Sequence, residues 1–140
     1  MKKKILIIII FLIILLILLA VIELLSNSLR KQEELIRVDL LEVMPFGTSM
    51  EDVINIVNNH EKWEIFGRVF NDSGIIIGPR GPSMGYPLSD EKIVGHKSMG
   101  IHLGKYLAYF FIETDVVAYI AFDENSNLIE IAIRKSSNVL

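Results

Sequence analysis

The sequence predicts an α+β protein in which a single N-terminal transmembrane helix and a helical stalk precede one helix packed on a three- to four-stranded antiparallel β-meander. Two observations lead to this fold class. An unbroken apolar run occupies residues 5–22, and the spacing of hydrophobic residues changes from helical to alternating near residue 63. A helix laid across a meander buries the apolar face of each.

The apolar run contains only Ile, Leu, Phe, Ala and Val, with no Gly, Pro or polar residue. As a helix it spans roughly 27 Å, close to the ~30 Å hydrocarbon thickness of a bilayer. The sequence therefore predicts a membrane anchor that contacts lipid through residues such as Ile5, Phe11, Leu16 and Ile22.

Two other kinds of N-terminal segment must be compared with an uncleaved signal anchor. A secretory signal has an apolar stretch of ~7–15 residues followed by a small-x-small cleavage site, and residues 22–26 lack that pattern. A lipoprotein signal needs a cysteine, and the chain has none. The anchor is the preferred interpretation, and a cleaved signal stays open as the alternative.

The charges that flank the run predict its orientation. Lys2, Lys3 and Lys4 precede it, whereas the basic residues after it alternate with acidic ones, so the N-terminus is expected in the cytoplasm. We therefore expect a single-pass protein of the cell membrane with an extracytoplasmic C-terminal domain. Frequent Ile, Lys and Asn without Cys suit the cell envelope of a low-GC bacterium.

Charge and cysteine content exclude several classes of partner and site. Beyond the anchor, acidic residues outnumber basic ones, and the whole chain carries a net charge of −3. Such a surface disfavours nucleic acid and anionic lipid as partners of the domain. The absence of cysteine removes disulfides and thiolate metal sites.

The chain is expected to have three parts. Residues 1–23 form the cytoplasmic tip and anchor, residues 24–44 a juxtamembrane stalk, and residues 45–140 the extracytoplasmic domain. The stalk should stop before Pro45. Its apolar stripe either packs on the chain's own domain or pairs with a partner helix.

The domain begins with a helix signal. Thr48 followed by Glu51 is the spacing of a capping box, and Met50, Val53 and Val57 then share one face of a helix. Alternation predicts strands over residues 63–70, 99–103, 116–122 and 129–133, with a turn at residues 123–127 between the last two. Residues 71–97 are rich in Gly and Pro and are expected to form a long loop, with residues 75–77 the one candidate strand.

Residues suited to catalysis are few. His60, His96 and His102 lack metal-binding spacing, and the Gly-rich stretch at 78–87 has no phosphate-loop pattern and carries prolines that remove N–H donors. The sequence predicts no catalytic, cofactor-binding or metal-binding residue, and hence a protein that is not an enzyme.

Residues typical of protein interfaces occur in two places. Arg80, Met84 and Tyr86 lie in the proline-stiffened 78–87 loop. The tyrosines expected on the open face of the sheet are Tyr106, Tyr109 and Tyr119. These six residues are the predicted partner contacts. The alternatives are a poorly ordered loop that contacts nothing, and tyrosines that only fill strand positions.

Two segments carry a family resemblance. Residues 45–53 read PFGTSMEDV and open an apolar helix, and residues 122–131 read FDENSNLIEI at the end of the meander. Together they resemble one repeat of the β-lactamase-inhibitor-protein-like fold, shared with the small SmpA/OmlA lipoproteins of the outer-membrane β-barrel assembly machinery. The resemblance implies a non-catalytic scaffold that binds other proteins through its sheet or loops.

The expected function is that of a membrane-anchored, non-catalytic extracytoplasmic module that binds another envelope protein. It would serve as an assembly or accessory subunit, or as an inhibitor or immunity-type protein. The alternative is a small regulatory membrane subunit that acts through its transmembrane and stalk helices. The identity of the partner and the oligomeric state stay open.

Overall fold

The computed structural model describes the backbone of residues 2–109 and 112–138, and the side chains of residues 9–22, 32–105 and 114–136. The chain divides into two compact units, Met1–Glu34 and Leu35–Leu140, which are described separately. Helix α1 (Lys2–Val43) forms the first unit and contributes its last residues to the second.

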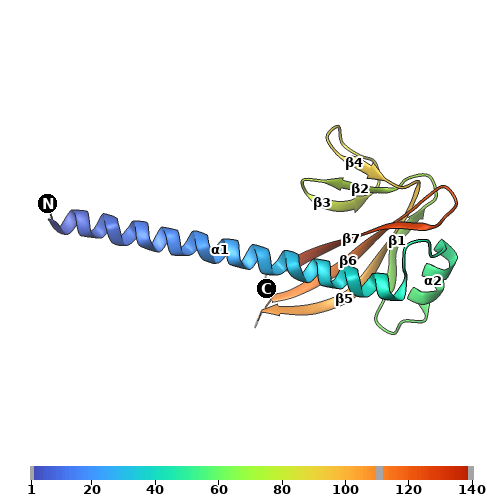
Figure 1. The fold of residues 1–140 in the computed structure, drawn as a ribbon, viewed down its shortest axis with the longest axis horizontal. Coiled ribbons are helices and arrows are strands. Elements are labelled where there is room, and N and C mark those ends of the chain that lie inside the picture. Colours follow the sequence, from blue (N-terminus) through green and yellow to red (C-terminus); the bar gives the residue numbers. More distant parts are fainter. Residues whose placement is uncertain (1, 110–111, 139–140) are drawn as a thin grey trace. The chain divides into compact units, whose positions relative to one another are not determined.

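The second unit is α+β with two antiparallel sheets (Figure 1). After the end of α1 comes helix α2 (Met50–Asn58). The larger sheet has the order β1-β5-β6-β7, and the smaller sheet has the order β3-β2-β4. The strands are β1 (Glu64–Phe70), β2 (Ile75–Gly78), β3 (Gly81–Met84), β4 (Lys92–Val94), β5 (Lys97–Tyr109), β6 (Ile112–Phe122) and β7 (Leu128–Asn138).

The predicted membrane anchor is corrected by the structure. Among the residues whose side chains are described, no helix combines the length and the apolar character that crossing a membrane requires. Residues 9–22 are the part of the predicted anchor whose side chains are described. Phe11, Leu16 and Ile22 lie in this stretch and are exposed, whereas the side chain of Ile5 lies outside the described residues.

The other predictions that depended on a membrane anchor are therefore also wrong. They are the transmembrane helix in the predicted fold class, the signal anchor, and the single-pass location in the cell membrane with an extracytoplasmic domain. The predicted fold class also differs in its sheets, because one meander was expected and two sheets are present.

The last residues of α1 belong to the core of the second unit. Leu40 and Met44 are buried there with Val53 and Val57 of α2, and Ile36 packs against the same cluster. For this part of the expected stalk, the apolar stripe packs on the chain's own domain. Met44 N–H donates to the Leu40 carbonyl at 2.8 Å, and the helix ends before Pro45.

Helix α2 begins one residue later than the capping pattern predicts. Ser49, not Thr48, is the N-cap, and its Oγ accepts a hydrogen bond from the Asp52 N–H at 3.1 Å. The Thr48 hydroxyl is used in the preceding turn, where it donates to the Pro45 carbonyl at 2.6 Å. Gly47 has φ +90° in that turn, a conformation that glycine adopts without strain.

The two faces of the larger sheet bury different residues because side chains alternate along a strand. On β6, Val116, Ala118, Ile120 and Phe122 pack toward the helices. The residues between them face the other way, where Tyr119 and Ala121 form a second buried cluster with Ile75.

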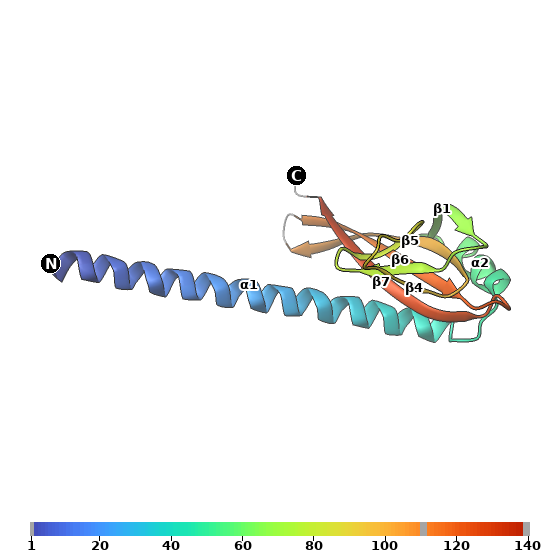
Figure 2. The same cartoon turned by 90° about the horizontal axis from the view of Figure 1, so that it is seen from above.

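That second cluster is covered by the segment expected to be a long loop. Residues 75–94 contain the three strands of the smaller sheet, and Figures 1 and 2 show this sheet lying over β5, β6 and β7. Ser98 on β5 is buried and donates to the Ser73 carbonyl at 2.8 Å, which fixes the start of the segment to the larger sheet. The sheet has one helical face and one face covered by a second sheet, so it has no open face in this region.

The prolines and glycines of the segment are compatible with these short strands. Pro79 and Arg80 form the link between β2 and β3, and the pair Gly78 and Gly81 closes this hairpin. Pro82 lies on the edge strand β3 opposite Ile77, a position in which the missing N–H is tolerated. The composition that indicates a loop therefore also permits a small, tightly turned sheet.

Candidate functional site

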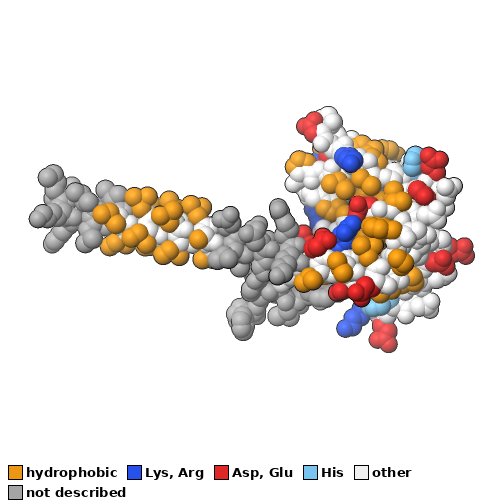
Figure 3. Space-filling model, viewed as in Figure 1, with side chains coloured by type: hydrophobic (Ala, Val, Ile, Leu, Met, Phe, Trp, Pro, Cys, Tyr) orange, Lys and Arg blue, Asp and Glu red, His pale blue; other side chains and the backbone are white. Residues whose placement is uncertain are grey.

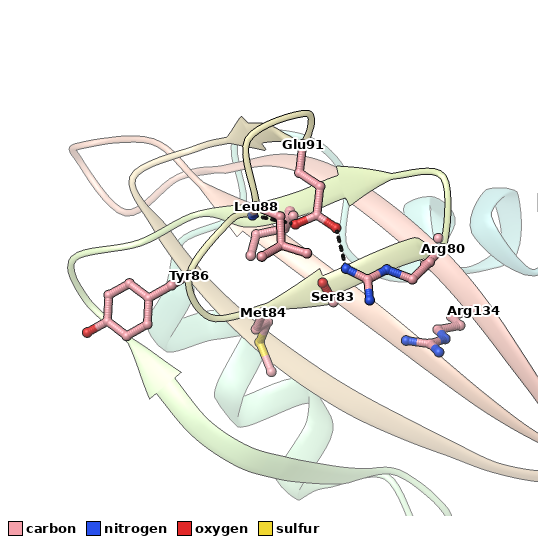
Figure 4. Close-up of a pocket in the computed structure, with 9 residues that line it drawn as sticks. Arg80, Ser83, Met84, Tyr86, Leu88, Glu91 and Arg134 are labelled. Carbon is pink, nitrogen blue, oxygen red and sulfur yellow. Dashed lines mark hydrogen bonds and ion pairs between the residues drawn. The ribbon is translucent and has the colours of Figure 1, made fainter.

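An open pocket lies beside the smaller sheet in the second unit (Figure 4). Its volume is about 290 Å³. Strands β2 and β3, the loop at residues 85–91 and strand β7 contribute its walls. The lining residues are Ile76, Arg80, Gly81, Ser83, Met84, Tyr86, Leu88, Glu91 and Arg134.

Three of the six predicted partner contacts meet at this pocket. Arg80, Met84 and Tyr86 all line it, although the link before β3, the end of β3 and the following loop contribute one each. Tyr86 is 88% exposed, and Figure 4 shows its ring directed away from the strands. Met84 is partly buried because it packs against the cluster around Tyr119.

Glu91 holds the loop above the pocket in place. One carboxylate oxygen, Oε2, accepts a hydrogen bond from the Leu88 N–H at 2.9 Å. The other, Oε1, lies 3.4 Å from Nη2 of Arg80. The side chain of Glu91 is only 12% exposed, whereas that of Arg80 is 72% exposed, so the arginine is tethered at one end and open to solvent at the other.

Arg134 on β7 of the larger sheet adds a second positive charge to the pocket. It lies on β7 opposite Val117 of β6, on the face covered by the smaller sheet. In Figure 4 its side chain extends toward Ser83, as does that of Arg80. Among the residues that the structure describes, Arg134 makes no hydrogen bond and no ion pair. The lining thus carries two arginines against one glutamate.

The rim of the pocket is apolar. Two of its lining residues, Tyr86 and Leu88, are 88% and 60% exposed. On the face of this unit seen in Figure 3, hydrophobic side chains lie between single acidic and basic groups. An exposed aromatic ring next to a positively charged hollow is an arrangement suited to binding, since both apolar area and charge are available to a partner.

Tyr119, one of the three predicted tyrosine contacts, is not part of this site. Tyr119 is 8% exposed and packs edge-to-face against Phe66, with ring centroids 5.8 Å apart. It lies beneath the smaller sheet, so the open face on which it was expected does not exist there. The side chains of Tyr106 and Tyr109 lie outside the described residues.

The histidines lie in three separate places. His60 stacks on Trp63 with ring centroids 3.9 Å apart. His96 Nε2 lies 3.5 Å from a Glu124 carboxylate oxygen, and His102 Nε2 lies 3.5 Å from Asp115 Oδ1. None of the three lines the pocket above. Within the described part of the chain, no group of three or more His, Asp or Glu side chains could hold a metal ion.

One carboxyl group has a clearly shifted pKa, and its cause is structural. The backbone N–H of Asn127 donates to Asp123 Oδ1 at 2.8 Å, and this bond to the charged form lowers the pKa of Asp123. The Asn127 side-chain amide adds a second bond at 3.2 Å. The group closes the turn between β6 and β7 and lies outside the pocket lining.

Sequence reasoning missed Leu88, Glu91 and Arg134. Alternation along β7 places Arg134 on the face opposite Ile131 and Ile133, and this signal was available. The signal does not reveal that the 71–97 segment folds over that face. Only the tertiary arrangement brings Arg134 to the same pocket as Arg80.

Comparison of this chain with family models, with curated proteins and with solved structures finds no match of any of the three kinds. The class of protein is therefore defined by the fold and the site alone. It is a two-sheet α+β domain. Its outer layer, which is the smaller sheet β3-β2-β4 with its loops, carries an open, arginine-lined pocket. Membership in the β-lactamase-inhibitor-protein-like family stays a prediction.

Proposed function

We propose that this chain is a non-catalytic protein-binding module that contacts its partner through the pocket beside the smaller sheet. One observation carries the proposal: Tyr86, an aromatic residue that is 88% exposed, stands at the rim of a pocket with two arginine side chains. Tyr and Arg are enriched among the residues that dominate binding energy at protein interfaces.

The shape of the pocket favours a protein partner over a small molecule. Sites for small ligands usually have volumes of roughly 300–1,000 Å³ and enclose most of the ligand within mainly apolar walls. This pocket of about 290 Å³ is open, and charged side chains form much of its lining. It has the size to receive a protruding side chain, while the surrounding apolar rim contacts the rest of a partner surface.

The rigidity of the outer layer supports the same proposal. Glu91 tethers the 85–91 loop, Ser98 ties the segment to β5, and Ser73 Oγ donates to the Gly85 carbonyl at 3.3 Å. A surface that is ordered before binding loses less conformational entropy when a partner docks. The contact residues are therefore presented by a scaffold rather than by a loose loop.

Residues 45–53 and 122–131, which carry the family resemblance, are also consistent with this function. Gly47 N–H donates to the Leu128 carbonyl, and Leu128 N–H donates to the Thr48 carbonyl, each at 2.8 Å. The helix start and the final turn thus form one structural unit at one end of the sheets. Proteins of the family that they resemble act as scaffolds for other proteins, which agrees with a binding role for this chain.

Site-specific photocrosslinking tests the proposal. A photoreactive phenylalanine analogue is introduced at Tyr86 in the full chain, and the matched control carries it at Ile129, which is also exposed but lies outside the pocket. We expect one discrete protein adduct in cells at position 86 and not at position 129. Equal adducts at both positions, or none at position 86, would contradict the proposed function.

A further inference from the structure

We infer that the pocket receives a carboxylate side chain from an acidic segment of the partner protein, with Arg134 as its ion-pair partner. The inference rests on the proposed function and adds the chemistry of what is bound. It follows from how the three charges of the pocket are used in the structure.

The single acidic group of the pocket is already occupied. Both oxygens of Glu91 have partners, the Leu88 N–H at 2.9 Å and the Arg80 guanidinium at 3.4 Å. Its side chain is nearly buried, so a cation from outside has little access to it. A basic partner segment would meet two arginines and no available carboxylate, which makes a cationic ligand unfavourable.

The available charge is positive. Arg134 is exposed and has no hydrogen bond or ion pair within the described residues. A guanidinium group presents a fixed fork of N–H donors that matches the two oxygens of a carboxylate. Arg80 shares only one end of its guanidinium with Glu91 and adds a second positive charge on the same side of Ser83. The pocket is thus locally cationic on a chain whose net charge is −3.

The surroundings determine what lies next to the carboxylate. Leu88 and Tyr86 form an exposed apolar rim, and Met84 forms part of the wall. An acidic side chain that enters the pocket would bring its sequence neighbours against this rim. The segment that fits best therefore carries an Asp or Glu beside a large apolar residue, and burial of that residue adds to the ion pair.

Binding of designed peptides to the full chain tests the inference. The probes are short fluorescein-labelled peptides rich in Leu and Ser that differ at one central position, which is Glu, Gln or Lys. Fluorescence anisotropy measures their affinity. We expect the Glu peptide to bind about tenfold or more tightly than the Gln peptide, because an ionised acceptor strengthens the hydrogen bonds to arginine. The Lys peptide should bind most weakly.

Two charge-reversal variants distinguish an effect of the pocket on peptide affinity from an effect of the overall charge of the protein. R134E should weaken binding of the Glu peptide about tenfold or more. The matched control R68E changes charge equally at an exposed arginine that stacks on Phe70 outside the pocket, and it should leave affinity within about twofold. Thermal unfolding confirms that both variants are folded.

Each outcome decides the inference. Equal affinity for the Glu and Gln peptides, equal effects of R134E and R68E, or no binding of any peptide would overturn it. Free glutamate is included as a competitor, because strong competition by the amino acid alone would mean that the pocket takes any small carboxylate rather than a peptide segment. If the Tyr86 crosslink persists in R134E while the peptide tests fail, the binding function stands and the carboxylate inference falls.

Discussion

The two faces of the larger sheet are built in different ways. On the helical face, one cluster of buried residues such as Met99, Ile101 and Phe122 joins α1, α2, β5, β6 and β7, and the partly buried Ile65 and Val69 of β1 pack against it. On the other face, the buried cluster is small and centres on Ile75, Tyr119 and Ala121. There, backbone contacts and side-chain hydrogen bonds such as that of Ser98 share the task of holding the outer layer.

The two faces therefore differ in how much apolar surface they bury. The helical face supplies most of the apolar burial. The outer layer buries less, uses short strands, and carries the pocket with its exposed rim. Parts of a protein with few buried apolar contacts open locally at lower free energy than the core does. Substitutions in the two layers should therefore have different consequences.

The largest effect is expected in the helical core. F122A removes a fully buried ring from the centre of the cluster and leaves a cavity, which should lower the free energy of unfolding by about 3–5 kcal/mol. Chemical denaturation measures the change, and the whole unit should unfold in one transition. A loss below about 1 kcal/mol would mean that the two layers do not differ as described.

A smaller and more local effect is expected from G74A. A Cβ atom at this position would overlap the backbone carbonyl of Val94, so strands β2 and β4 could not keep their present approach. We expect a loss of about 2 kcal/mol. Amide hydrogen exchange should quicken in β2 and β4 and stay slow in the centre of β6.

The matched control for this change is S89A, an exposed position in the same segment whose loss should lie within about 0.5 kcal/mol. Uniformly faster exchange throughout β6 in G74A would show that the outer layer is not a separate cooperative unit.

The exposed edge of β7 gives a third test. Arg37 Nε donates to the Ile131 carbonyl at 2.9 Å, the Ile131 N–H donates to Glu130 at 3.0 Å, and the two side chains form an ion pair at 2.8 Å. Together they occupy backbone groups to which another strand could bind. R37A should cost about 1 kcal/mol and increase self-association, measured by sedimentation velocity. An unchanged sedimentation profile at high concentration would contradict the role of this pair.

The smallest effect concerns pH and the turn at Asp123. Because the folded state lowers the pKa of Asp123, the folded protein holds this proton less readily than the unfolded chain does. The stabilisation is complete above the unfolded pKa of about 3.9 and is lost as the pH falls through the lower folded value. Denaturation curves of wild type and D123N should therefore converge as the medium becomes more acidic.

The control for this prediction is D90N, in an exposed turn of the other layer. A difference between wild type and D123N that does not depend on pH in the acidic range would contradict the assigned cause of the shift.

Local patterns were sufficient for elements whose signals lie within one segment. Alternation over residues 116–122 predicts the centre of β6, and the apolar face of Val53 and Val57 predicts α2. The cap moved from Thr48 to Ser49 because the threonine hydroxyl bonds to the preceding turn, a competition that spacing alone does not decide.

The outer layer could not be predicted in the same way. Strands of three or four residues, interrupted by Gly and Pro, are too short to show a periodicity, and the pattern does not reveal that they pack on β5, β6 and β7. Without this layer, the sequence places Tyr119 on an open face and does not connect Arg134 with Arg80. Arg80, Met84 and Tyr86, which line the pocket, were predicted as partner contacts from their types and their proline-rich context, and their contact with a partner stays a prediction.

The contact between the start of α2 and the entry to β7 sets the order of events during biosynthesis. Met50 N–H donates to the Ser126 carbonyl at 2.8 Å, and Ser49 bridges to Asn127, so an early helix depends on backbone made more than seventy residues later. The helix start therefore stays without these partners until residues 126–127 have been synthesised. This end of the domain can close only after the turn between β6 and β7 has been made.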